Sequence, residues 1–367
     1  MSTRLQQLHD QFGQSPWLDN LRRDWLDSGE IAAWVARGVR GITSNPSIFA
    51  KAIGGSSDYD EQLAASLRVS SSVTGAYWDL VCTDVTRALD VLRPLHDSSG
   101  GEDGYVSVEV DPALAHDTEG TVAAARSLAA RIDRPNLFVK VPATEAGIPA
   151  IRTLTAEGIS VNVTLIFAIE RYRSVMEAYL KGLEDAPDAV VPTVRSVASF
   201  FVSRVDAEVD KRLDGLGSPE ALALRGRVAV ANAQVAYDEF VATFSGDRWD
   251  ALRRRGANLQ RPLWASTSTK NPAYPDTLYI DELIGPSSVN TLPDDTLVAF
   301  LDHGTLARTI DRDPGEARAA LEACRAVGID LAAVTDQLEA EGVAAFRKSF
   351  DDLIATLEAK ATTMRTA

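Results

Sequence analysis

The stretch Asn136-Leu-Phe-Val-Lys-Val-Pro-Ala-Thr144 contains a short run of apolar, β-branched and aromatic residues that ends at Pro142. The run is too short and too rich in β-forming residues for a helix, so it predicts a buried strand over 137–141. Lys140 lies within this strand, where its charge would lose solvation. Burial favours a neutral amine, which can attack a ketone and form a Schiff base. Alternatively, Lys140 reaches solvent at the strand end or pairs with a carboxylate, and this segment alone does not decide between these outcomes.

Similar apolar runs recur along the chain, and helical segments separate them. We predict eight strands, at 16–19, 39–43, 105–110, 137–141, 159–166, within 190–202, 262–266 and 277–280. Strands that alternate with helices pair in parallel, and eight such units most naturally close into a (β/α)8 barrel of the α/β class. An open doubly wound sheet is the second choice, but the sequence lacks the glycine-rich nucleotide loop typical of that fold.

The predicted domain organisation is a single barrel domain over 1–367, with additional helices at both termini. Helical, Ala- and Leu-rich sequence occupies 294–303 and 315–363. We therefore expect a helical C-terminal extension from about 304, and we assign it no chemistry. The Ser-, Gly- and Asp-rich segment 96–104 is predicted to be a surface loop, also without chemistry.

The composition limits the classes of binding partner and the cellular compartment that we expect for this protein. The chain has 367 residues, a hydrophobic fraction of 45% and a net charge of −15. This acidic balance argues against nucleic acid and anionic membranes, although a local basic pocket could still bind a small phosphorylated substrate. The polar N-terminal segment lacks the apolar core of a signal peptide, and no stretch approaches about 18 uninterrupted apolar residues. We expect a cytoplasmic protein without a membrane partner; its oligomeric state, including a homo-oligomer, is left open.

Cysteine and histidine usage gives no sign of a metal centre. Cys82 and Cys324 are too few and too far apart for a disulfide framework or a zinc site, and we expect reduced core residues. The four histidines are scattered without metal-ligand spacing. The sequence therefore predicts a protein that holds no metal.

Polar residues recur where the predicted strands end. The carboxyl ends of the strands are where (β/α)8 barrels place their chemistry. Residues two apart in a strand share a face, so Asn162 and Thr164 can both point inward. Each polar residue taken alone has a simpler explanation as a helix cap or a solvated loop residue, but their repetition on six or seven strands favours a site. The candidates are Asp19, Thr43, Asn45, Glu109, Lys140, Asn162, Thr164, Ser199, Arg204 and Ser266.

Three of these segments resemble signatures of the transaldolase family. Gly41-Ile-Thr-Ser-Asn-Pro-Ser-Ile-Phe49 is similar to the first signature, and 136–167 is similar to the second, which carries the Schiff-base lysine. Val108-Glu-Val-Asp111 resembles the segment that carries the catalytic glutamate. The resemblance runs from about 17 to 303. It implies a class I, cofactor-free transferase of the pentose phosphate pathway, whose substrates are sugar phosphates.

The resemblance also implies roles for the reacting residues. Lys140 would form the Schiff base with the donor ketone, sedoheptulose 7-phosphate or fructose 6-phosphate. Glu109 would handle protons through a water held by Thr164, and Asp19 would take the proton of the C4 hydroxyl as the C3–C4 bond breaks. The dihydroxyacetone unit would then pass to glyceraldehyde 3-phosphate or erythrose 4-phosphate. Burial in an apolar strand should raise the pKa of Glu109, although a nearby protonated Lys140 would oppose this shift.

The same resemblance implies which residues hold the substrate. Thr43, Asn45 and Asn162 would hold the dihydroxyacetone part, whereas Ser199 and Arg204 would bind the phosphate. The chain departs from shorter transaldolases after the seventh predicted strand, where they have a further arginine. In Ala265-Ser-Thr-Ser-Thr-Lys270, either Ser266 or Lys270 takes that place. Lys51, close to the Asn-Pro motif, is expected to be a solvated helix residue.

Two rival functions are compatible with part of this pattern. Another Schiff-base barrel, a fructose-phosphate or deoxyribose-phosphate lyase, would release its product without needing an acceptor. A non-catalytic sugar-phosphate-binding barrel would keep Arg204 but would have no use for both Lys140 and Glu109. The presence of both residues favours the transferase.

Overall fold

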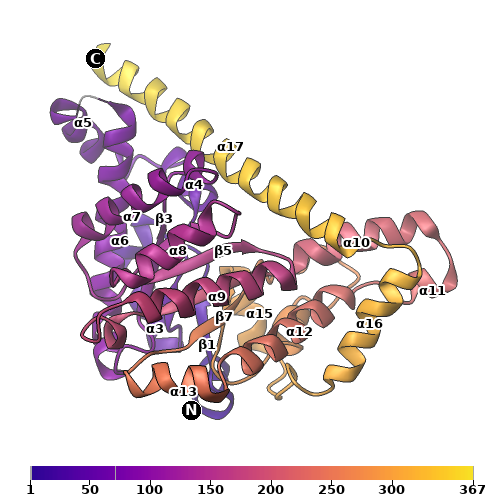
Figure 1. Cartoon of the computed structure of the whole chain (residues 1–367). Coiled ribbons are helices and arrows are strands. Elements are labelled where there is room, and N and C mark those ends of the chain that lie inside the picture. The colour runs from indigo at the N-terminus through magenta and orange to yellow at the C-terminus, as the bar shows by residue number, and fades with distance from the viewer. Residues whose placement is uncertain (1, 71, 367) are drawn as a thin grey trace.

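The computed structural model of the chain, which describes residues 2–70 and 72–366, contains a closed barrel of eight parallel strands (Figure 1). The strands follow one another around the barrel in sequence order, and β8 pairs with β1 to close it. This confirms the predicted (β/α)8 fold class. The strands are β1 (Gln14–Leu18), β2 (Gly41–Ile42), β3 (Tyr105–Glu109), β4 (Leu137–Pro142), β5 (Val161–Ile166), β6 (Ser196–Phe201), β7 (Gln260–Ala265) and β8 (Ser288–Leu292).

Seven of the strands lie where the sequence predicts them, but the predicted eighth strand is wrong. The run 277–280 forms a short helix, α14 (Leu278–Asp281), and the eighth strand is β8. A four-residue apolar run fits a buried helical turn as well as a strand, and Tyr279 and Ile280 are buried in either case. β8 escaped prediction because polar residues, including Asn290 and Thr291, occupy most of it.

Helices surround the barrel and account for the segments between the strands (Figure 1). In the first half of the chain they are α1 (Arg4–Phe12), α2 (Arg23–Ser28), α3 (Glu30–Arg37), α4 (Pro46–Gly54), α5 (Asp60–Val69), α6 (Val73–Ser98), η1 (Pro112–Leu114), α7 (Thr118–Ile132), α8 (Gly147–Ala156) and α9 (Ile169–Asp185). In the second half they are η2 (Val191–Thr193), α10 (Ser203–Leu216), α11 (Pro219–Leu222), α12 (Val228–Thr243), α13 (Gly246–Arg254), α14, α15 (Asp294–His303), α16 (Pro314–Ala326) and α17 (Leu331–Thr366). Within the described residues, no helix combines the length and apolar character that a bilayer span requires.

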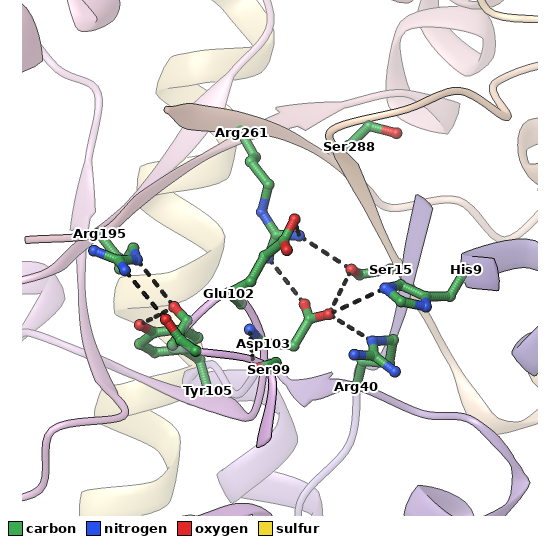
Figure 2. Close-up of polar contacts among 12 residues, drawn as sticks. His9, Ser15, Arg40, Ser99, Glu102, Asp103, Tyr105, Arg195, Arg261 and Ser288 are labelled. Carbon is green, nitrogen blue, oxygen red and sulfur yellow. Dashed lines mark hydrogen bonds and ion pairs between the residues drawn. The ribbon is translucent and has the colours of Figure 1, made fainter. Parts of the chain in front are cut away.

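The amino end of the barrel contains a buried ion cluster around Asp103 (Figure 2). Arg261 of β7 and Arg40 donate to opposite oxygens of its carboxylate, at 3.0 and 2.5 Å, and Ser15 of β1 donates at 3.0 Å. The prediction of a surface loop over 96–104 is therefore wrong for Asp103, whose side chain is fully buried. Serines, glycines and acidic residues are typical of solvent-exposed loops, and they led to this prediction. The two arginines that neutralise the charge of Asp103 lie far from it in the sequence.

The electrostatics of this cluster stabilise the charged form of Asp103. Burial disfavours its charge, but the positive charges of Arg261 and Arg40 and their hydrogen bonds outweigh that effect and lower the pKa below 3.8. The cluster therefore holds a carboxylate between guanidinium groups at the barrel end that commonly serves stability rather than chemistry.

The C-terminal segment is helical, and its last helix crosses the carboxyl end of the barrel. The predicted helical region 315–363 contains α16 and α17, and the break between them follows Ala326. α17, yellow in Figure 1, packs against α4 and α6 along one part of its length and against α10 and the end of β5 along another. It therefore lies over the strand ends where the candidate residues gather.

Candidate active site

A cavity of about 590 Å³ lies at the carboxyl ends of the strands. Its size suits a sugar phosphate, because pockets for small ligands typically measure about 300–1,000 Å³. Most of the residues predicted from the sequence line it, and Glu109, Asn162 and Thr164 lie in the barrel strands next to it. The predicted residues that line the cavity are Asp19, Thr43, Asn45, Lys140, Ser199, Arg204, Ser266 and Lys270.

Lys140 lies at the centre of a row of polar residues across three neighbouring strands. Glu109 of β3 is its register partner on one side, and Asn162 of β5 is its partner on the other. Equal register in neighbouring strands directs the three side chains to the same face. The Lys140 ammonium lies 3.6 Å from Glu109 Oε2 and donates to the backbone carbonyl of Ser44 at 3.4 Å. Only 4% of Lys140 is exposed, so the lysine is buried and paired with a carboxylate.

The Glu109 carboxyl group can be either protonated or ionised near neutral pH. Burial raises the pKa of Glu109 to about 7, although the charge of Lys140 opposes the shift. The sequence left the sign of the net shift open, and in the structure burial is the larger of the two effects. Among the described residues, neither Glu109 Oε2 nor Thr164 Oγ1 has a hydrogen-bond partner, although both atoms are buried. Buried polar atoms without a protein partner are places where proteins bind ordered water.

A second carboxylate, that of Asp19, also lines the cavity. Asp19 follows β1, and its Oδ1 accepts a hydrogen bond of 2.6 Å from Thr43 Oγ1, which also contacts the Thr291 hydroxyl at 2.6 Å. Burial raises the pKa of Asp19 above 3.8, while the hydrogen bond from Thr43 and the charge of Lys140 oppose the shift. Thr43 therefore fixes the orientation of this carboxylate.

Two amide side chains are fixed by different means. Asn45 is the N-cap of α4, where its Oδ1 accepts from the backbone N–H of Ile48 at 3.0 Å, and the residue lines the cavity. Asn162 donates to Ser107 Oγ at 2.9 Å and accepts from Ser199 Oγ at 2.7 Å. The structure thus places Ser199 deep in the barrel beside Asn162, where the two strands β5 and β6 pair.

Basic side chains gather at another part of the cavity wall. Arg204, in the first turn of α10, has no hydrogen bond or ion pair within the described part of the chain, and its guanidinium lies over the Phe201 ring at 5.3 Å. Lys270 donates to Ser268 Oγ at 2.6 Å. Burial and the positive charges of Arg204 and Lys51 lower the pKa of Lys270. The cavity therefore contains mutually repelling cations that an anion would stabilise.

Ser266 connects the segments that carry these cations. It has a left-handed conformation with φ of 55°, and its hydroxyl lies 3.0 Å from that of Ser203. The backbone N–H of Ser203 donates to the Ser266 carbonyl at 3.0 Å. The end of β7 is thus tied to the start of α10, which carries Arg204.

Several cavity residues were missed in the sequence. Thr291 was missed because β8 was misplaced, and Lys51 is exposed as predicted but also lines the cavity. Phe346 comes from α17, far along the chain, and only its helical spacing with other apolar residues could have suggested burial. The described residues contain no cluster of three His, Cys, Asp or Glu side chains suited to a metal ion.

The fold and this cavity define a (β/α)8-barrel enzyme whose site is built around a buried lysine and two carboxylates. The family model "Transaldolase/Fructose-6-phosphate aldolase" matches residues 16–357. Transaldolase 1 of Streptomyces avermitilis is 51% identical over 98% of this chain and 96% of its own length. The transaldolase of Thermobifida fusca is 52% identical over 96% and 97%, respectively.

The chain belongs to the transaldolase/fructose-6-phosphate aldolase family. Its full-length similarity to transaldolases makes it an enzyme of the transferase class. The sequence resemblance to transaldolases is confirmed.

Proposed function

We propose that this enzyme transfers a dihydroxyacetone unit between sugar phosphates through a Schiff base on Lys140, as a transaldolase of the pentose phosphate pathway. The donor is sedoheptulose 7-phosphate or fructose 6-phosphate, and the acceptor is glyceraldehyde 3-phosphate or erythrose 4-phosphate. The observation that carries the proposal is the buried Lys140 amine, 3.6 Å from Glu109, beside a cavity of sugar-phosphate size.

Schiff-base formation uses the Lys140–Glu109 pair. The neutral amine of Lys140 adds to the C2 carbonyl of the donor, and the resulting carbinolamine loses its hydroxyl group as water. Glu109, whose pKa is about 7, can accept a proton and return it at neutral pH. Glu109 Oε2 and Thr164 Oγ1 are buried and accept or donate no hydrogen bond among the described residues, which supports a bound water as the carrier of that proton.

Bond cleavage uses Asp19. The carboxylate takes the proton of the C4 hydroxyl, the C3–C4 bond breaks, and the aldose phosphate leaves with a new aldehyde. The electron pair remains on the three-carbon unit as an enamine of Lys140, which then adds to the acceptor aldehyde in the reverse sequence. The raised pKa of Asp19 suits a group that both takes and returns a proton, and Thr43 orients it.

Orientation of the substrate is shared between polar side chains and cations. Asn45, Thr43 and Asn162 hold the hydroxyl groups of the three-carbon unit. Ser199, for which the resemblance implied phosphate binding, we assign instead to holding the Asn162 amide in place through its hydrogen bond. Arg204 and Lys270 bind the phosphate, where guanidinium geometry matches pairs of oxygens. Ser266 supports this end of the cavity through its contact with Ser203.

A turnover assay separates this proposal from its rivals. With fructose 6-phosphate and erythrose 4-phosphate, the enzyme should form sedoheptulose 7-phosphate and glyceraldehyde 3-phosphate. Without the acceptor, release of dihydroxyacetone should be slow. Equally fast release without the acceptor would identify a lyase, and the absence of any turnover would identify a binding protein.

A further inference from the structure

One buried face of α17 packs against the barrel near the strand ends, and its residue Phe346 lines the active-site cavity. Leu338, Gly342, Phe346, Phe350 and Leu353 are spaced by three or four residues, so they share this face, and all five are buried. The packing of α17 against α4, α6, α10 and β5 places the face over the strand ends (Figure 1). The helix is therefore part of the site, although its sequence gave no chemical signal.

Two contacts fix the position of α17 along the barrel rim. At Gly342, an added Cβ would approach Leu165 Cδ2 at 2.8 Å and an Arg204 Nη1 atom at 3.7 Å, so this helix position lies close to the end of β5. Further along the helix, the hydroxyls of Ser349 and Ser47 lie 2.8 Å apart and tie α17 to α4. Phe346 lies between these two contacts, about one helical turn from each.

Phe346 covers the reacting lysine. Its ring centroid lies 5.6 Å from Lys140 Nζ, and the residue is 4% exposed while lining the cavity with Lys140 and Asp19. An aromatic ring at this distance stabilises a cationic nitrogen and occupies space that water would otherwise fill.

We propose that Phe346 is a specificity-determining residue that shields the lysine-bound three-carbon intermediate from water, and so favours its transfer to an acceptor over its release. The inference rests on the proposed function. The matched family includes both a transaldolase and an aldolase by name. Transfer and release differ in the fate of this intermediate, so control of water at Lys140 separates the two outcomes.

The competing release consumes one water molecule. The enamine carbon C3 takes up a proton and gives the imine of dihydroxyacetone. Water then adds to C2, the C2–N bond breaks, and free dihydroxyacetone leaves as the Lys140 amine is regenerated. The oxygen of the released ketone comes from water, so an apolar ring over the lysine nitrogen slows this branch, whereas transfer to an acceptor needs no water at C2.

The test measures the ratio of free dihydroxyacetone released to dihydroxyacetone transferred, with fructose 6-phosphate as donor and erythrose 4-phosphate as acceptor. Phe346→Ala should raise this ratio by about tenfold, because water could then reach the lysine-bound carbon that the ring now covers. Phe346→Leu restores apolar volume and should return the ratio most of the way to the wild-type value. If the alanine variant does not fold, Phe346→Val gives the same comparison with a smaller truncation.

Leu353→Ala is the matched control, since Leu353 is buried on the same face about two turns away and does not line the cavity. It should lower the unfolding temperature as a cavity-forming change does, while leaving the ratio unchanged. An unchanged ratio in Phe346→Ala, or an equal rise in Leu353→Ala, would overturn the inference. Failure of the proposed function is distinct, since the wild-type enzyme itself would then show no transfer.

Discussion

The Glu109 carboxyl group lies in a barrel interior that disfavours its charge, and its pKa of about 7 makes both protonation states available at neutral pH. Dehydration of the carbinolamine requires a proton donor, and the protonated form of Glu109 predominates below about pH 7. Its contribution should therefore decrease as the pH rises through this value. Comparing the enzyme with Glu109→Gln isolates this contribution, because Lys140 is present in both proteins.

Glu109→Gln should slow single-turnover formation of the lysine adduct by about 10²–10⁴-fold at pH 6, the usual contribution of an acid–base group. The ratio of the wild-type rate to the variant rate should fall as the pH rises from 6 to 8. Thr164→Ala should show a milder defect, because it removes one anchor of the proposed water and leaves the acid in place. A ratio that does not vary with pH would contradict the role given to Glu109.

The polar row around Lys140 was predictable from single residues, because polar side chains are unusual within buried strands. The register of the neighbouring strands then brings these side chains together. Phe346 was not predictable in this way. An apolar residue on an apolar helix face is ordinary in sequence, and only the path of α17 over the barrel brings it to 5.6 Å from Lys140.

At the scale of elements, the end of β7 and the start of α10 act together because Ser266 joins them. Arg204→Gln should raise the KM for a phosphorylated ketose by about ten- to a hundredfold, since hydrogen bonds to charged groups contribute about 1.5–3 kcal/mol. Lys270→Gln should act in the same direction but less, because Lys270 is more exposed to solvent than Arg204. The kcat should change little, as expected when binding common to ground and transition states is lost.

An unphosphorylated ketose provides the control for both phosphate-site variants, and its turnover should be nearly indifferent to either change. A large fall in kcat at an unchanged KM would show instead that these cations act on the reacting carbons.

One predicted element, the strand over 277–280, was wrong. The run 277–280 has a strand-like composition, but it follows Pro275 and Asp276 and closes into a helical turn. β8 carries Ser288, Asn290 and Thr291, which are buried and form hydrogen bonds with other parts of the fold; the Asn290 amide nitrogen, for example, donates to the Tyr279 carbonyl. These hydrogen bonds depend on the closed barrel and cannot be predicted from the sequence of one strand.

At the scale of the whole molecule, the candidate active-site cavity lies at the carboxyl end of the barrel, and the buried ion cluster of Asp103, shown in Figure 2, lies at the amino end. Asp103→Asn would leave the buried Arg261 and the partly buried Arg40 without their carboxylate, and breaking a buried ion pair in this way typically costs about 3–5 kcal/mol. We expect a lower unfolding temperature with kcat/KM little changed in the folded enzyme.

The pH dependence of that loss has a definite sign. The folded-state pKa of Asp103 lies below 3.8, so the carboxylate contributes stability at pH values above 3.8, and this contribution is lost as the pH falls through the folded-state pKa. The difference in unfolding free energy between wild type and Asp103→Asn should therefore be large at pH 7 and narrow below about pH 4. Asp90→Asn, which removes an exposed partner of Arg134, is the control and should change little. A similar loss in both variants would argue against a special role for the buried cluster.

The Schiff base on Lys140 is the claim on which the other assignments depend, and borohydride reduction in the presence of fructose 6-phosphate tests it most directly. The reduced enzyme should gain the mass of one three-carbon unit, located by peptide mapping at Lys140. Lys140→Arg should fold normally, form no adduct and lose essentially all turnover, because arginine keeps the charge but cannot form the imine. Lys51→Arg, a change to another lysine of the same cavity, should still be labelled. An adduct that persists in Lys140→Arg, or that maps to Lys51 in the wild-type enzyme, would contradict the account.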